Sequence, residues 1–103
     1  ENGQQIDGPT EKVMSNRDLQ AKYEAFGWNV MRMDGNNAED IQNTLIKAKA
    51  ALGNGSPIMI IMKTEMGAGV DFMMYSHKWH GVAPNDQQLQ DALAQLEETL
   101  GDY

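Results

Sequence analysis

Apolar and polar residues follow two different periods along this chain, and the periods predict strands separated by helices. Residues 58–62 (IMIIM) form an unbroken apolar run, typical of a strand that is buried on both faces of a parallel sheet. Residues 28–33 (WNVMRM) predict a second strand, with polar exceptions at Asn29 and Arg32. Between these strands, four apolar residues at helical spacing predict a helix: Ile41, Leu45, Ala48 and Leu52.

Capping residues and glycines indicate where the first two helices begin and end. Asn37, followed by Asp40 three positions later, predicts the start of the helix between the strands. An earlier helix is predicted over residues 16–26, with Ser15 as its cap and Gly27 as its end. Both helices therefore have local signals at their ends as well as an apolar face.

The last helix follows Pro84. Asn85 and Gln88 have the spacing of a capping box, and Gly101 is the predicted end of the helix. Its apolar face is a row of leucines: Leu89, Leu93, Leu96 and Leu100. At the other end of the chain, residues 1–13 are rich in turn signals and are expected to form a loop.

Strand, helix and strand in this order make a βαβ unit, whose two strands run parallel. The predicted fold class is therefore α/β, with three helices and at least two parallel strands. Two strands alone cannot form a stable sheet. We therefore expect residues 1–103 to be a single segment of a larger parallel sheet, whose other strands come from residues before Glu1, from another chain or from self-association.

Residues 64–84 follow the apolar strand and show neither a helical nor a strand period. A loop of this length in a small domain is usually either functional or disordered. Open α/β sheets bind ligands beyond the carboxyl ends of their strands. Residues 2–8, 34–37 and 64–84 should therefore meet along one edge of the sheet, and this edge is the candidate ligand site.

The side chains near this edge offer oxygen ligands and flexible backbone. Asn2 has a carboxamide oxygen, and backbone carbonyls lie next to it around Gly3. Such oxygens suit Mg²⁺ or Ca²⁺, although an Asn-Gly pair is also common in ordinary polar turns. Gly67 and Gly69 would let the backbone approach a ligand closely, and a flexible turn explains them equally well.

Two histidines lie near the end of the long loop. His77 and His80 have a spacing compatible with metal binding, but the chain has no cysteine and no third ligand nearby, which argues against zinc. His80, beside Gly81, could instead bind a phosphate or move a proton, because histidines titrate near neutral pH. Composition and spacing alone indicate part of an α/β ligand-binding domain.

The formal net charge is −7, from 15 acidic and 8 basic residues. This acidic excess argues against nucleic acid or an anionic membrane surface as a partner. No apolar run approaches the length of a membrane span and no signal peptide is visible, so we expect a cytoplasmic protein.

Four sequence blocks are more informative together than apart: NGQQIDGPTEKV, KYEAFGWNVMRMDGNN, PIMIIMKTEMGAGVDF and KWHGVAPND. Their order and spacing resemble those of transketolases, and the resemblance covers nearly the whole chain. It implies that residues 1–103 are the later part of a parallel-sheet thiamine diphosphate-binding domain. The implied cofactors are thiamine diphosphate and Mg²⁺.

The resemblance also implies a role for six residues. Asn2 matches a side-chain ligand of the Mg²⁺ ion, and Gln4 matches a residue that binds this ion through its backbone carbonyl. The other implied cofactor contacts are Ile6, Met66, Gly67 and His80. His80 is also the implied catalytic residue, because it matches a histidine that lies at the diphosphate and the substrate channel.

The implied activity is the transfer of a two-carbon ketol unit between sugar phosphates. It requires a pyrimidine-binding domain within a homodimer or a heterotetramer. The alternatives are another thiamine diphosphate enzyme (a deoxyxylulose-phosphate synthase or a 2-oxo-acid dehydrogenase component) and a non-catalytic interaction module.

This chain departs from the family pattern in three respects. It does not contain the family's Gly-Asp-Gly motif, whose Asp is another Mg²⁺ ligand. Glu1 stands where relatives commonly carry Asn or Asp, and residues 65–69 lack the lysines often seen in bacterial relatives. The family's catalytic glutamate belongs to a different domain, so we expect residues 1–103 alone to be inactive.

Overall fold

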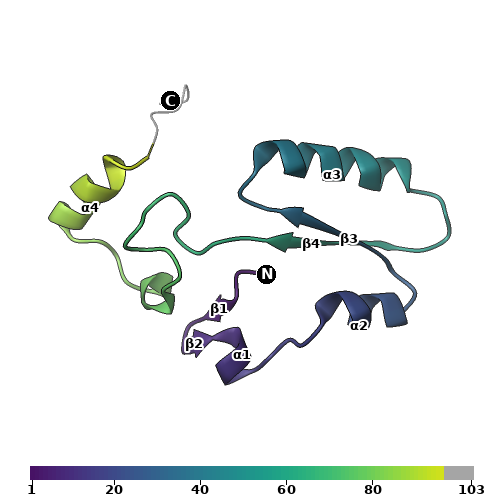
Figure 1. The fold of residues 1–103 in the computed structure, drawn as a ribbon, viewed down its shortest axis with the longest axis horizontal. Helices are drawn as coiled ribbons and strands as arrows, with labels where there is room; N and C mark the ends of the chain where they lie inside the picture. The colour runs from purple at the N-terminus through teal and green to yellow at the C-terminus, as the bar shows by residue number, and fades with distance from the viewer. Residues whose placement is uncertain (97–103) are drawn as a thin grey trace.

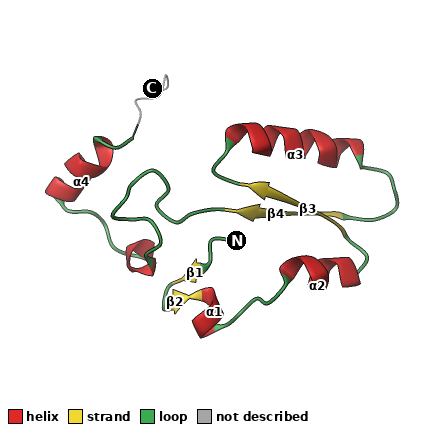
Figure 2. Cartoon of the chain, viewed as in Figure 1, coloured by secondary structure: helices red, strands yellow, loops and turns green. Residues whose placement is uncertain are grey.

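Short strands and helices alternate along residues 1–96, the part of the chain that the computed structural model describes. In chain order the elements are β1 (Gln4–Gln5), β2 (Gly8–Pro9), α1 (Thr10–Val13), α2 (Leu19–Ala25), β3 (Asn29–Asp34), α3 (Ala38–Ala50), β4 (Ile58–Lys63), the 3₁₀ turn η1 (His77–His80) and α4 (Asp86–Leu93). Figure 1 follows the elements along the chain, and Figure 2 distinguishes helices from strands.

The centre of the fold is a parallel pair of strands, β3 and β4, in register from Asn29 opposite Ile58 to Asp34 opposite Lys63. Helix α3 connects the two strands and lies on one side of them, whereas α2 and the N-terminal segment lie on the other side (Figure 1). This arrangement confirms the predicted α/β class and the βαβ unit. The three predicted helices are present, and α1 is an additional short helix.

The predicted caps are right for two helices and wrong for a third. The side-chain oxygen of Asn37 accepts from the Asp40 nitrogen at 3.0 Å, and Asn85 forms a complete capping box with Gln88. Helix α2, by contrast, begins after Asp18 rather than after Ser15, because the Asp18 carboxylate accepts from the Ala21 nitrogen. No helix can cross residue 17, since Arg17 has a left-handed backbone with φ of 53°.

Four other assignments differ from the sequence prediction. Residues 1–13 are not simply a loop, because β1 and β2 pair as a small antiparallel hairpin that runs into α1. Helix α4 ends at Leu93, well before the predicted end at Gly101. Leu100 and Gly101 lie outside the described residues. Strand β3 is shifted by one residue and β4 is extended to Lys63, as is usual for predicted boundaries.

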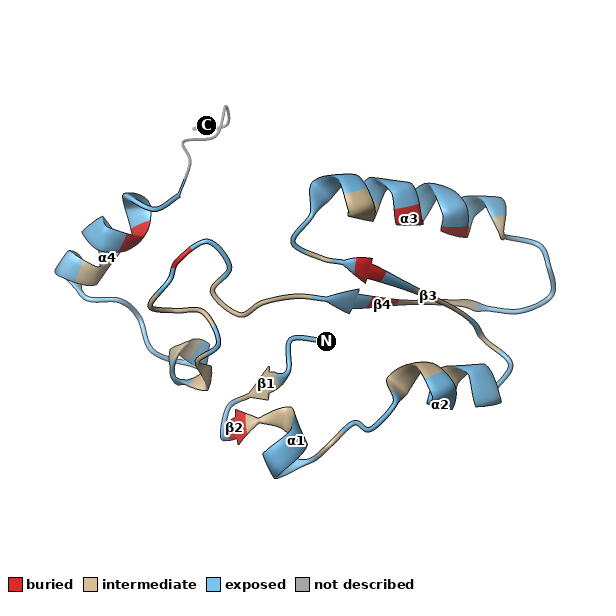
Figure 3. Cartoon of the chain, viewed as in Figure 1, coloured by how far each residue is buried: buried red, intermediate tan, exposed pale blue. Residues whose placement is uncertain are grey.

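The buried core of the described chain is small, as the few red segments in Figure 3 show. Its apolar members are Met33, Ala48, Ile61, Val70 and Ala92. On α3, Ala48 and Thr44 are buried, whereas Leu45 and Leu52 are 52% and 67% exposed. The predicted stripe is therefore wrong in part: the helix turns its small residues inward, and two strands are too narrow to cover the neighbouring leucines.

Strand β4 is also less buried than its apolar sequence predicts. Ile61 is buried, but Met62 is 40% exposed. The Cα radius of gyration is 17.2 Å, compared with about 13 Å expected for a compact domain of this length. Much apolar surface thus remains uncovered within this chain.

No helix among residues 1–96 is long and apolar enough to cross a membrane.

Gly35 is a position where the fold leaves no room for a side chain. A Cβ at Gly35 would overlap Met62 Cγ and lie 2.6 Å from Thr64 Cγ2. We expect Gly35→Ala to destabilise the intact protein by about 1–3 kcal/mol, because the end of β4 must shift. Urea unfolding measures this loss. Gly81→Ala is the control, since its Cβ meets nothing within 4 Å, and an equal loss in both variants would contradict the steric explanation.

Candidate functional site

Three segments meet where β3 and β4 end. The backbone nitrogen of Glu1 donates to the Met62 carbonyl at 2.7 Å, and the Thr64 nitrogen donates to the Glu1 carbonyl at 3.2 Å. This is the pattern of a parallel neighbour beside β4. An ion pair between Arg32 and Glu1 supports the same placement. Asn2 is therefore held at the carboxyl edge of the sheet.

The turn after β3 is bonded to the segment after β4. The side-chain oxygen of Asn36 accepts from the Glu65 nitrogen at 2.8 Å, and the Gly35 nitrogen donates to the Lys63 carbonyl at 2.6 Å. The expectation that residues 2–8, 34–37 and 64–84 converge at one edge is thereby confirmed at the first residues of each segment.

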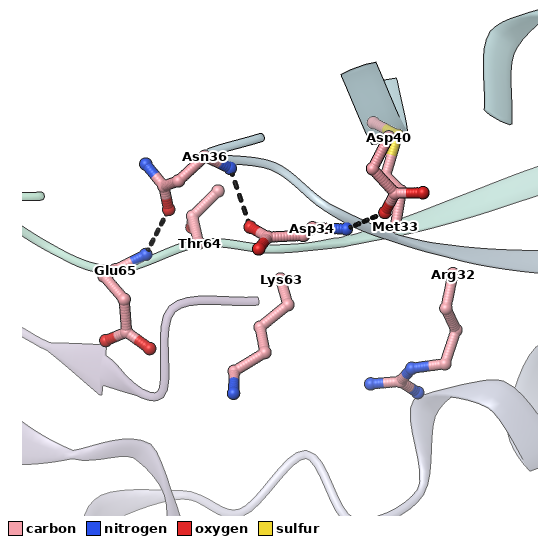
Figure 4. A pocket seen from close by; sticks show the side chains of 8 residues that line it. All are labelled: Arg32, Met33, Asp34, Asn36, Asp40, Lys63, Thr64 and Glu65. Atoms are coloured by element: carbon pink, nitrogen blue, oxygen red, sulfur yellow. Dashed lines mark hydrogen bonds between the residues drawn. The ribbon is translucent and has the colours of Figure 1, made fainter. Parts of the chain in front are cut away.

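A groove opens at this edge between the ends of β3 and β4 (Figure 4). Its lining residues are Arg32, Met33, Asp34, Asn36, Asp40, Lys63, Thr64 and Glu65. The Asp34 carboxylate accepts from the Asn36 nitrogen, and the Asp40 carboxylate accepts from the Asp34 nitrogen at 2.7 Å. These two carboxylates therefore shape the turn that carries Asn36. In Figure 4, Arg32 and Lys63 point away from Asp40, toward the N-terminal segment.

A second groove lies along the N-terminal segment and contains two of the predicted site residues, Asn2 and Gln4. Thr64 lines both grooves, so they adjoin at the end of β4. The Asn2 side-chain oxygen accepts from the Gln4 nitrogen at 3.0 Å. This bond fixes the carboxamide at the groove, and its oxygen keeps a second lone pair for another partner.

Two side-chain amide atoms in this second groove are buried without a hydrogen-bond partner among the described residues. They are Oε1 of Gln4 and Nε2 of Gln5. Buried polar atoms in folded proteins nearly always have a partner, which is often an ion or water. Because successive side chains of a strand point to opposite faces, the two atoms mark separate unfilled hydrogen-bond positions beside β1.

The turn that carries His80 lies beside β1. Element η1, residues His77–His80, contacts β1, Gln4–Gln5, although more than 70 residues separate them in the sequence. His80 itself is exposed. The structure thus brings the turn of His80 to the strand of Gln4. Ile6 follows β1 at the tip of the hairpin and is 60% exposed.

Gly67 is required by the fold of the long loop. Its φ of +68° favours glycine, and a Cβ there would lie 2.6 Å from the Cβ of Met73 and 2.9 Å from the Met73 carbonyl oxygen. The loop therefore folds back tightly at this residue, and Met66, half-buried, precedes the bend. Both are on the segment that leaves β4.

Three residues at this edge fall within the predicted segments but are not singled out as site residues: Gln5, Asn36 and Thr64. Asn36 lies in a polar turn, and nothing in the turn sequence indicates that its side chain bonds to Glu65 rather than to solvent. Gln5 follows Gln4 in a polar strand of two residues, and only the burial of its amide distinguishes it.

Within residues 1–96, no three His, Asp or Glu side chains gather closely enough to hold a metal ion.

Comparison with known proteins gives a family match over nearly the whole chain. Residues 1–101 match the family model described as transketolase, thiamine diphosphate binding domain. The chain is 35% identical over 96 residues to an apulose-4-phosphate transketolase subunit of Phocaeicola vulgatus, covering 93% of this chain and 34% of that protein. It is 34% identical to the 6-deoxy-6-sulfo-D-fructose transketolase subunit SqwG of a Clostridium species, with the same coverage.

A transketolase of Vibrio vulnificus is 39% identical over 82 residues, which are 79% of this chain and 12% of that protein. The chain thus spans about a third of the length of the transketolase subunits that it matches, 34% in each case. The match to the family model extends over nearly all of its residues, and so this chain belongs to the transketolase family, within the thiamine diphosphate-binding domain.

Proposed function

We propose that this chain is the later part of the diphosphate-binding domain of an enzyme that transfers a two-carbon ketol unit between sugar phosphates, with Mg²⁺-bound thiamine diphosphate as cofactor. The family match over residues 1–101 carries this proposal. It is supported by the convergence of Asn2, β1 and η1 at the carboxyl edge of the sheet. When bound, thiamine diphosphate supplies the electron sink for cleavage of a carbon–carbon bond.

In this proposal the N-terminal segment holds the metal ion and the diphosphate. Asn2 contributes its side-chain oxygen and Gln4 its backbone carbonyl, which are ligands that Mg²⁺ accepts and Ca²⁺ accepts as well. The bond from the Gln4 nitrogen orients the Asn2 oxygen in advance.

The other site residues act around the cofactor. Ile6 presents an exposed apolar side chain to it, and Met66 and Gly67 cover it from the long loop. His80 is the proposed catalytic residue: its imidazole binds the diphosphate or holds a proton of the substrate at the channel. An exposed side chain on a short 3₁₀ turn beside β1 is accessible for this role.

The remaining parts of the active site come from elsewhere in a cytoplasmic enzyme. Three relatives are named as transketolase subunits, which favours an assembly of separate chains such as a heterotetramer, and a homodimer of longer chains is the other arrangement. In either assembly a pyrimidine-binding domain completes the site. The sugar-phosphate contacts come from that assembly too, because this chain has a net charge of −7.

We expect the intact protein to bind thiamine diphosphate in the presence of Mg²⁺ and to lose that binding when a chelator removes the metal. Calorimetric titration measures the binding, and transfer between a ketose phosphate and an aldose phosphate measures the activity. Residues 1–103 prepared alone should show no ketol transfer, because they lack the pyrimidine-binding domain. Failure of the intact protein to bind thiamine diphosphate, or transfer by the isolated segment, would contradict the proposal.

A further inference from the structure

Residues 69–71 of the long loop pack against the residues that follow α4. Val70 is only 5% exposed, although loop residues usually lie at the surface. Its nitrogen donates to the Gly67 carbonyl and its carbonyl accepts from Met73, both at 3.0 Å, so residues 67–73 form successive turns. A Cβ at Gly69 would lie 2.9 Å from Leu96 Cδ2, which shows how closely the loop approaches the residues that follow α4.

Both polar atoms of the Gln95 side chain form hydrogen bonds with Asp71 in the loop. Oε1 of Gln95 accepts from the Asp71 backbone nitrogen at 2.8 Å, and Nε2 of Gln95 donates to Oδ1 of Asp71 at 2.9 Å. Asp71 Oδ1 also accepts from the Phe72 nitrogen at 2.6 Å. Because the amide uses its donor and its acceptor on the same residue, it fixes both the position and the orientation of Asp71.

The contact continues from Asp71 to the turn that carries His80. The carbonyl of Phe72, the residue after Asp71, accepts from the indole nitrogen of Trp79 at 3.0 Å. The rings of Phe72 and Trp79 meet edge to face with centroids 5.5 Å apart. Trp79 precedes His80 in η1, and η1 contacts β1. A continuous set of contacts thus connects Gln95, just after α4, to the candidate site.

We propose that Gln95, Asp71, Phe72 and Trp79 form a positioning network that sets the place of His80 and of the Gly67 bend at the cofactor. This inference rests on the proposed function, since the network itself touches no cofactor. Gln95 lies just after α4 and bonds the loop at Asp71, between Gly67 and His80. Loss of the Gln95 side chain would therefore leave both the Gly67 bend and the turn of His80 less well fixed.

The test compares Gln95→Ala with a matched change within α4, at Gln87, in the intact protein. We expect Gln95→Ala to weaken Mg²⁺-dependent binding of thiamine diphosphate by about tenfold, because two hydrogen bonds are lost. Hydrogen–deuterium exchange should rise in residues 64–80 and stay unchanged in residues 29–63. The control is Gln87→Ala, which also removes a Gln–Asp hydrogen bond, from Gln87 to Asp91 at 2.9 Å, but not one to the loop.

Two further variants separate positioning from general stability. Asp71→Asn keeps an oxygen that can accept from Gln95 and should bind thiamine diphosphate like the unaltered protein. Gln95→Glu keeps the acceptor but places a carboxylate against Asp71, so it should weaken binding as Gln95→Ala does, and it replaces that variant if the alanine form fails to fold.

The outcomes distinguish the inference from the proposed function. Normal binding of thiamine diphosphate by both Gln95 variants, alongside normal binding by the unaltered protein, overturns the network and leaves the proposed function intact. Increased exchange spread over residues 29–63 also overturns it, because the effect would then be global unfolding. If the unaltered protein does not bind thiamine diphosphate, the proposed function fails and the role of the network at the cofactor fails with it.

Discussion

Replacing His80 by alanine in the intact enzyme is expected to lower kcat by about a hundredfold to ten-thousandfold, the usual contribution of a group that transfers a proton in the transition state. The expectation follows from the proposed role of His80, the placement of its turn beside β1 and its exposed side chain. Steady-state ketol transfer at saturating cofactor measures the change.

A neighbouring residue provides the control for this variant. Lys78 stands in the same 3₁₀ turn and is also exposed, so Lys78→Ala alters the turn and its charge without removing the imidazole. We expect it to retain nearly full activity. An unchanged kcat in His80→Ala, or an equal loss in Lys78→Ala, would remove His80 from the catalytic role.

Asn2→Ala is expected to weaken Mg²⁺-dependent binding of thiamine diphosphate by at least about tenfold to a hundredfold. Changes to groups that merely support a metal ligand commonly cost that much, and this variant would remove the proposed ligand itself. The variant also removes the bond from the Gln4 nitrogen that orients the turn. Calorimetric titration of the cofactor at several Mg²⁺ concentrations measures the loss, which should shrink as the metal concentration rises.

Two further substitutions at Asn2 separate the loss of the metal ligand from the loss of the hydrogen bond to the Gln4 nitrogen. Asn2→Asp keeps an oxygen that can accept from the Gln4 nitrogen and can bind Mg²⁺, so it should retain most of the affinity. Asn2→Ser can keep a bond to the turn but is a weaker metal ligand, so it should resemble alanine. Equal affinity in the alanine and unaltered proteins would show that Asn2 is not a ligand of the metal.

Local signals in the sequence predict much of the fold. Asn37 and Asn85 each stand one residue before a helix and accept from the nitrogen three residues later, as their spacing indicates. The same reasoning misplaces the start of α2, because Ser15 and Asp18 are both good caps and only the left-handed backbone of Arg17 decides between them. A sequence does not display that backbone angle.

Packing over longer distances is less accessible to prediction. The helical period allows α3 to bury either Leu45 or Thr44 beside Ala48, since both choices form a continuous stripe. The position of α3 on a two-stranded sheet selects Thr44 and exposes Leu45. Similarly, the edge that gathers Asn2 and Asn36 follows from parallel strands, but the pairing of Asp71 with Gln95 spans 24 residues without a local pattern.

The left-handed backbone at Gly67 and Gly69 limits which positions of this loop can be substituted. Both residues have positive φ, and a side chain at either would meet Met73 or Leu96. The intervening Ala68 and the preceding Met66 carry no such restriction of backbone angle. Within residues 66–69, substitutions that preserve the path of the chain are therefore confined to the alternate positions 66 and 68.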